Sequence, residues 1–334
     1  MWRLSCKSCG FKGEAEKYYP YCPRCGSPLS IEGKAPSFKP ILGEGNTPIV
    51  EERLGDNRVY YKLEYLNPTG SFKDRGVSYN ISLASSLGYR CVVEDSSGNT
   101  GISVAAYSSR MGMESKVIIP ASAPKGKKSL LRALGAEVVE SETRDKGTEI
   151  AEKLSKRCFY VSHARNPFFI EGIKSVAREL KDLHIRGAIV PSSSFSLFLG
   201  TYYGFNEIGK RVMMFAVQGK ETASLKKYIK PIYESKGSTS RLADGLALSS
   251  SPRAEEAFHA IKESNGGLIV LDDEDIKRGL KLLWRKGYMV EPTSATSLVA
   301  LQKLNELGYD VDGFVLMLTG NGLKFYDMIE NMLK

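Results

Sequence analysis

The stretch CVVEDSSGNTGISVAAYSSRMGMESKVIIP, residues 91–120, decides the fold class. Its apolar runs 91–93 and 116–119 are typical of short buried strands, and the segment through 104–107 has helical character. A strand, a helix and another strand in this order form a parallel crossover unit, whose sheet is covered by helices. The same alternation recurs along most of the chain, so the sequence predicts an α/β fold with doubly wound sheets.

The remaining strands are predicted from short apolar runs that helical segments separate. One such helical segment is 275–286, where Ile276, Leu280 and Leu283 recur at helical spacing. Cys91 and Cys158 lie in apolar runs and are predicted to be core residues. The other predicted strands are 137–139, 159–161, 187–190, 212–217, 268–271 and 314–318.

Composition excludes several classes of protein. The chain has 334 residues, a length typical of one or two domains. Hydrophobic residues make up 42% and charged residues 25%, which is typical of a globular protein, and the net charge is +9. No run approaches the roughly 20 apolar residues of a membrane span, and the N-terminus shows no signal peptide, so we expect a cytoplasmic protein. The basic residues are scattered, which favours anionic small molecules over nucleic acid as partners. The only two glutamines, Gln218 and Gln302, give a weak hint of a thermophilic source.

Four cysteines form two closely spaced pairs, Cys6 with Cys9 and Cys22 with Cys25. Two C-x2-C pairs can wrap around one tetrahedral ion, which favours a zinc ribbon over residues 1–30. Two disulfides are the alternative, but the cytoplasm keeps such thiols reduced. The predicted zinc is structural because four cysteines leave no open coordination position, and iron remains an alternative metal.

The first loop with chemical character is 63–76. Asn-Pro-Thr-Gly at 67–70 is a strong turn signal, and Ser71 is a candidate cap for a helix that runs towards Gly88. Lys73 then lies in the first turn of that helix, where the positive end of the helix disfavours its ammonium form and so favours an amine nucleophile. The alternative is an ordinary surface lysine, and helix position alone does not decide between the two.

The second such loop, 94–101, connects the strand at Cys91 to the next helix. Small polar residues that enter a helix N-terminus expose backbone N–H groups, which can bind a carboxylate. The alternative is an ordinary N-cap turn, which would need only one of these residues.

Together, NPTGSFKDRG at 67–76 and SSGNTG at 96–101 resemble signature motifs of the pyridoxal-phosphate (PLP) enzymes of the tryptophan-synthase β type, and most closely those of the threonine synthase group. Some members of that group also carry an N-terminal zinc ribbon. The resemblance implies a small domain at 79–175 and a large cofactor-binding domain made of 31–78 and 176–334, with the cofactor between them, and it implies a homodimer. Further matching motifs are GEGNTP at 43–48, NP at 166–167, IEGIK at 170–174, EPTSA at 291–295 and LTGNGLK at 318–324.

The resemblance also implies roles for individual residues. Lys73 would bond covalently to the cofactor aldehyde and then act as acid and base. Asn99 would bind the hydroxyl of the pyridine ring, and Thr319 would bind the ring nitrogen without holding it protonated, which suits elimination and replacement reactions. The substrate carboxylate would be held by Ser96, Ser97, Gly98 and Thr100.

The sequence departs from the family pattern at two places. The loop expected to bind the cofactor phosphate is usually rich in glycine, but here it is Ser192, Ser193, Ser194, Phe195 and Ser196. We interpret it as an altered phosphate cup built from hydroxyls and the following helix N-terminus, rather than as a loop with degraded cofactor affinity, because Lys73 is retained.

The second departure concerns the substrate. Threonine synthases typically place a serine and an arginine around the Asn-Pro motif to bind the substrate phosphate, and Ala164 and Phe169 occupy the matching positions here. The loss of the arginine removes a strong charge-assisted contact, for which Arg165 or His163 could substitute.

The reaction implied by the resemblance is the conversion of O-phosphohomoserine and water to threonine and phosphate, with Lys73 moving the protons. A rival hypothesis is a diverged lyase or β-replacement enzyme that acts on serine, threonine, O-phosphoserine or a related amino acid. Two further hypotheses are a non-catalytic relative whose ribbon binds a partner and a ribbon-containing nucleic-acid binder. We expect PLP and structural zinc as cofactors, an amino acid as the substrate, and neither nucleic acid nor membrane as a partner.

Overall fold

The computed structural model describes residues 1–96, 98–123 and 125–324. Ser97, a predicted substrate-binding residue, lies outside the described residues. The chain divides into two compact units, which we call the first and second units. The first contains 1–45 and 73–173, and the second contains 46–72 and the described chain from Lys174 onward. The ribbon thus belongs to the same compact unit as 73–173, while the three domains expected from the resemblance stay a prediction.

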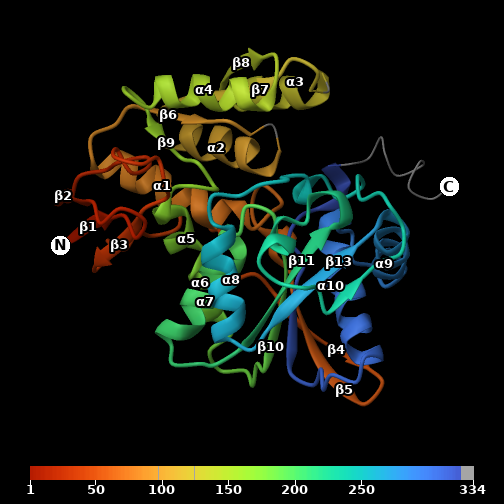
Figure 1. Cartoon of the computed structure of the whole chain (residues 1–334). Coiled ribbons are helices and arrows are strands. Elements are labelled where there is room, and N and C mark those ends of the chain that lie inside the picture. Colours follow the sequence, from red (N-terminus) through yellow and green to blue (C-terminus); the bar gives the residue numbers. More distant parts are fainter. Residues whose placement is uncertain (97, 124, 325–334) are drawn as a thin grey trace. The chain divides into compact units, whose positions relative to one another are not determined.

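The first unit contains two sheets. The ribbon sheet is antiparallel in the order β2-β1-β3, and the larger sheet is parallel in the order β8-β7-β6-β9 (Figure 1). The strands are β1 Trp2–Ser5, β2 Lys12–Ala15, β3 Ser30–Gly33, β6 Cys91–Glu94, β7 Glu114–Pro120, β8 Glu137–Ser141 and β9 Phe159–Tyr160. The helices are α1 Lys73–Ser86, α2 Asn99–Arg110, α3 Lys125–Ala133, α4 Arg144–Leu154 and α5 Pro167–Ile173.

Helices cover both faces of the parallel sheet. Alternate residues of β7 point to opposite faces, and each set packs against different helices. Ile118 packs in a cluster with Ala151 of α4. Val117 and Ile119 pack instead with residues of α2 and α3. This arrangement is the doubly wound layering that the strand–helix alternation predicts.

The second unit is built on a mixed seven-stranded sheet in the order β12-β13-β11-β10-β14-β5-β4, in which only the β4–β5 pairing is antiparallel (Figure 1). The strands are β4 Ile49–Leu54, β5 Asn57–Lys62, β10 Gly187–Pro191, β11 Met213–Gly219, β12 Tyr233–Glu234, β13 Gly267–Leu271 and β14 Phe314–Met317. The α-helices are α6 Ser175–Glu179, α7 Ser196–Glu207, α8 Ala254–Glu263, α9 Asp273–Arg285 and α10 Pro292–Glu306. Short 3-10 helices are Glu64–Leu66, Lys220–Thr222, Ser224–Lys227 and Asp244–Leu246.

The core of this unit lies between the sheet and the helices α9 and α10. Phe215 and Val217 of β11 join a large buried cluster with residues of both helices. The intervening Met214 and Ala216 are also buried and point to the other face, where α7 and α8 pack on β10 and β11. Strands buried on both faces are apolar throughout, which is why the sequence indicates them clearly.

The eight strands predicted from apolar runs are present as β6 to β11, β13 and β14. The sequence does not predict the hairpin of β4 and β5, because its first strand is only partly buried and the stretch IVEERL shows no apolar run. Among the described residues, no helix is both long and apolar enough to cross a membrane.

Cys158 belongs to a buried core cluster and Cys91 packs against it, as predicted, but the two are also joined by a disulfide that the sequence analysis does not predict. Their strands β6 and β9 are neighbours in the parallel sheet, and Val92 pairs with Phe159. The residues before that pair therefore stand side by side, with Cα atoms 4.6 Å apart. The disulfide depends on how β6 and β9 are aligned in the sheet. The two cysteines are 67 residues apart in the chain, so no local sequence pattern reveals the bond.

Candidate active site

Lys73 is the first residue of α1, as the turn signal before it predicts. Its Nζ atom lies 5.7 Å from the ring centroid of Phe169 in α5. The helices α1 and α5 pack closely here: a Cβ atom on Gly76 of α1 would come within 2.4 Å of the Phe169 ring, so only glycine fits at this position. The lysine amine therefore faces an aromatic side chain, and that side chain is fully buried.

The loop after β6 leads directly into α2, whose N-cap residue Gly98 makes no side-chain capping bond. Its N–H donates instead to the Ser96 hydroxyl at 3.3 Å. A Cβ atom on Gly101 would lie 2.0 Å from the Ser96 carbonyl oxygen, so only glycine lets the loop pack against the helix. A helix N-terminus without a side-chain cap is suited to binding a carboxylate, which agrees with the predicted role of this loop.

A titratable pair in the same unit consists of a buried carboxyl group and a half-buried imidazole. Glu94 ends β6, His163 follows β9, and His163 Nδ1 is 2.8 Å from Glu94 Oε1. Burial, with a further contribution from Asp95, raises the pKa of Glu94 well above its usual value, while Lys73 and the Ser162 N–H act in the opposite direction. Burial and the charge of Lys73 hold the pKa of His163 well below its usual value. Burial therefore disfavours the charged forms of both groups.

Arg165, a predicted substrate-binding residue, is directed towards α4 and the ribbon. Its guanidinium donates to Glu152 Oε1 at 2.7 Å and lies 5.6 Å from the Tyr21 ring centroid. The neighbouring Ala164 is half-buried and offers no polar side chain. The arginine that could replace the missing phosphate contact is thus paired with an acidic side chain and lies over an aromatic ring.

In the second unit, Thr319 follows β14 and lies between two polar side chains. Its Oγ1 atom is 3.1 Å from Glu291 Oε1 and 3.1 Å from Ser294 Oγ. All three residues are buried, and a Cβ atom on Gly320 would lie 2.2 Å from the Glu291 carboxyl carbon. The sequence motif EPTSA contains Glu291 and Ser294, but without the fold no role can be assigned to them.

Ser71 does not cap α1, and that prediction is wrong. Its hydroxyl is buried and has no hydrogen-bond partner in the described chain. Its backbone instead forms an isolated bridge with Gly320, and the Phe72 N–H donates to the Thr319 carbonyl oxygen at 3.0 Å. Lys73 is the next residue along the chain.

The serine-rich loop follows β10 and ends at the N-terminus of α7. All four of its serines are buried. Phe195, the residue before α7, has a φ of +63°, the left-handed conformation that glycine usually supplies in phosphate cups. The loop thus contains one left-handed residue that is not a glycine. Hydroxyls and a 12-residue helix N-terminus are groups that can bind a phosphate.

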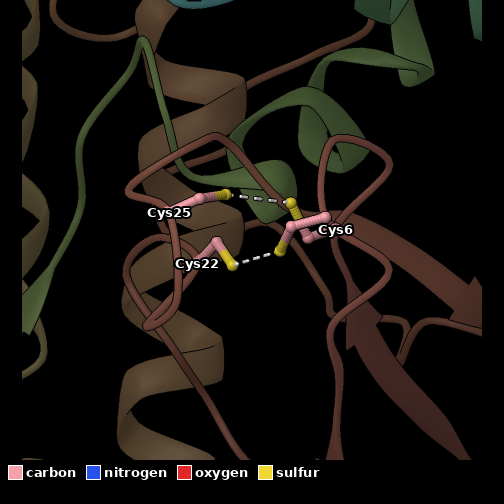
Figure 2. A group of neighbouring side chains, drawn as sticks. Cys6, Cys22 and Cys25 are labelled. Carbon is pink, nitrogen blue, oxygen red and sulfur yellow. Dashed lines mark hydrogen bonds between the residues drawn. The ribbon is translucent and has the colours of Figure 1, made fainter.

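The four N-terminal cysteines meet in the ribbon. Figure 2 shows the sulfur atoms of Cys6, Cys22 and Cys25 converging, and all four sulfurs lie within 4.8 Å of one another. None of the four is in a disulfide, which removes that alternative in this structure. A tetrahedral zinc with bonds of about 2.3 Å requires sulfurs roughly 3.8 Å apart. The separations of 3.6 Å for Cys6–Cys25 and 3.5 Å for Cys9–Cys22 fit that requirement.

A family model described as pyridoxal-phosphate dependent enzyme matches residues 41–320. The chain belongs to this family of PLP-dependent enzymes, with the α/β architecture of fold type II.

Two curated relatives carry the name threonine synthase. The protein of Methanocaldococcus jannaschii is 34% identical over 322 residues, an alignment that covers 89% of this chain and 78% of the relative. The protein of Synechocystis sp. is 31% identical over 333 residues, covering 95% of this chain and 84% of the relative. The crystal structure of O-ureido-L-serine synthase superimposes with a TM-score of 0.74 at 21% identity, covering 88% of this chain and 95% of that chain, and it shows the shared fold.

Proposed function

We propose that this chain is a PLP-dependent lyase that removes or replaces a leaving group on the side chain of an L-amino acid. The observation that carries the proposal is Lys73 at the start of α1, in a chain whose family is defined by a cofactor that reacts with a lysine amine. The loop at the N-terminus of α2 would hold the substrate carboxylate, through Ser96, Gly98 and Thr100 and through Ser97, which lies outside the described residues.

The residues of the second unit fit the other parts of PLP. The buried loop Ser192–Ser196 suits the phosphate, and Thr319 suits the ring nitrogen. Ser71 adds a buried hydroxyl that has no partner among the described residues, as expected where a polar group is missing. Asn99, in the first unit, would bind the ring hydroxyl. The bound cofactor would supply an electron-withdrawing ring, and Lys73 would take the proton from Cα and move protons in later steps.

The first substrate to test is O-phosphohomoserine, because the curated relatives are named threonine synthase. The reaction would yield threonine and phosphate. A second candidate, a serine- or threonine-type amino acid, is favoured by the fully buried Phe169 ring near the Lys73 amine, since an aromatic ring is a poor neighbour for a phosphate dianion.

The experiment mixes PLP-loaded protein with O-phosphohomoserine and quantifies phosphate and threonine. Parallel reactions with L-serine and L-threonine are assayed for the 2-oxo acid. Lys73→Ala should lose turnover and the visible absorption of lysine-bound cofactor together. Lys146→Ala is the matched control, because the Lys146 ammonium forms an exposed ion pair with Glu149. Turnover that survives Lys73→Ala would show that the lysine assignment is wrong.

A further inference from the structure

One buried carboxyl oxygen, in a group on which the charge of Lys73 acts, has no partner among the described residues. Glu94 Oε1 is paired with His163 Nδ1, but Glu94 Oε2 is buried and makes no hydrogen bond to any described residue. The Glu94 side chain is 0% exposed. Buried polar atoms in folded proteins almost always have partners, so an unpaired one in a reactive site points to a ligand that completes it.

Three relations place this pair near the Lys73 amine. The charge of Lys73 acts on both Glu94 and His163. The Lys73 amine faces Phe169, and the Phe169 and His163 rings lie 6.3 Å apart. Glu94 is also the last residue of β6, immediately before the loop that leads into α2. A substrate held by the cofactor beside the Lys73 amine, with its carboxylate on that loop, would therefore have these side chains close by.

The charge state of the pair decides what it can bind. When both groups are uncharged, the carboxyl O–H of Glu94 donates to His163 Nδ1, and the ring hydrogen of His163 is on Nε2. Glu94 Oε2 is then a carbonyl-type acceptor that needs a hydrogen-bond donor. A hydroxyl group supplies that hydrogen without bringing a charge into a buried place.

Other side chains of amino acids fit less well. A phosphate dianion presents only acceptors, so it would face Oε2 without a hydrogen between them, and Arg165 is engaged with Glu152. An ammonium group would add a second positive charge beside Lys73. A carboxylate would bring both a charge and another set of acceptors.

We propose that Glu94 Oε2 accepts a hydrogen bond from the side-chain hydroxyl of the substrate, and that Glu94, held by His163, makes the enzyme prefer a β-hydroxy amino acid to its phosphorylated form. Glu94 is thus a specificity-determining residue. This inference rests on the proposed PLP-dependent function and identifies its substrate class.

The test measures binding rather than turnover. PLP-loaded full-length protein is titrated with L-serine, L-alanine and O-phospho-L-serine, and the initial change in cofactor absorption gives the dissociation constants. Serine and alanine differ only in the hydroxyl. We expect serine to bind roughly tenfold more tightly than alanine, the effect of about one hydrogen bond, and O-phosphoserine to bind more weakly than serine.

Two variants separate recognition from structure. Glu94→Met keeps the length of the side chain but removes the acceptor, so serine and alanine should bind with equal affinity. Glu94→Gln is an isostere of the protonated acid and retains both the donor to His163 and an acceptor oxygen. Glu94→Gln should therefore keep most of the preference for serine over alanine. If Glu94 had only a structural role, Glu94→Met would keep this preference as well. Thermal unfolding checks that both variants are folded.

The wild-type titrations alone also decide the outcome if Glu94→Met does not fold. Equal binding of serine and alanine, or tightest binding of O-phosphoserine, would overturn this inference and leave the PLP-dependent function standing. No change in cofactor absorption with any amino acid, O-phosphohomoserine included, would overturn the proposed function and this inference with it.

Discussion

At the scale of single residues, Thr319 lies in a network of buried polar side chains. Its hydroxyl lies between the Glu291 carboxylate and the Ser294 hydroxyl. The Gly320 N–H donates to Ser294 Oγ at 3.0 Å, which holds that serine in place. A hydroxyl held in a network of this kind loses little rotational freedom when it binds a cofactor, because its position is already set.

Thr319→Val should weaken PLP binding. Valine keeps the shape of threonine but removes the hydroxyl, so we expect the dissociation constant of PLP to rise about tenfold, the effect of roughly 1.4 kcal/mol. Titration followed by cofactor absorption measures it. Thr296→Val is the matched control, because Thr296 is a buried threonine whose hydroxyl bonds only within α10, to the Thr293 carbonyl at 2.7 Å. Equal effects of the two variants would contradict a cofactor role for Thr319.

The sequence predicts residues that lie in a local motif and misses residues that act through partners. Lys73 is predicted at the start of a helix because a turn signal directly precedes it. The pairing of Glu94 with His163 is not predicted, because the two are 69 residues apart and meet only when β6 and β9 become neighbours. For the same reason, the partners of Thr319 and the pairing of Arg165 with Glu152 could not be inferred.

At the scale of elements, the ribbon packs against the segment that carries His163 and Phe169. The buried Tyr18 hydroxyl donates to the Tyr160 carbonyl at 2.6 Å and lies 3.2 Å from the Asn166 amide nitrogen. The Tyr18 ring also stacks on Phe159, with centroids 3.9 Å apart. The ribbon therefore supports this segment, as well as providing the cysteine cluster.

We propose that the cysteine cluster binds one zinc ion, and removal of this metal should disturb the supported segment. With a strong chelator, we expect a lower unfolding temperature and weaker amino-acid binding, since a ribbon without metal loses its fold. Metal analysis before and after chelation and restoration by added zinc are the controls. Tyr18→Phe, with the metal retained, should lower the free energy of unfolding by about 1–2 kcal/mol through the lost hydrogen bonds. A protein purified without metal and unaffected by chelator would contradict the zinc proposal.

The disulfide between β6 and β9 should stabilise the first unit. A cross-link over 67 residues restricts the unfolded chain, and we expect its loss to lower the free energy of unfolding by up to about 4 kcal/mol. Denaturant unfolding of the Cys91→Ala/Cys158→Ala variant against the oxidised wild type measures this effect. The wild type with a reductant is the second comparison, and it should resemble the variant.

At the scale of the whole molecule, we propose a homodimer, as the family resemblance implies. Light scattering during size-exclusion chromatography should give about twice the chain mass of 36.8 kDa. The measurement should be made at physiological and at high salt, because a net charge of +9 on each chain makes like-charge repulsion salt-dependent. A mass of one chain under both conditions would contradict the dimer.

The sequence by itself determined the α/β class, eight of the strands, the helix that begins at Lys73 and the two C-x2-C pairs. These features depend on residues close together in the chain, where hydrophobic periodicity and turn chemistry act. Only the tertiary structure decided that Cys91 bonds to Cys158, that Glu94 pairs with His163, and that Arg165 pairs with Glu152. Each of these pairs depends on which strands and helices pack together, and packing brings together residues whose local sequences carry no sign of each other.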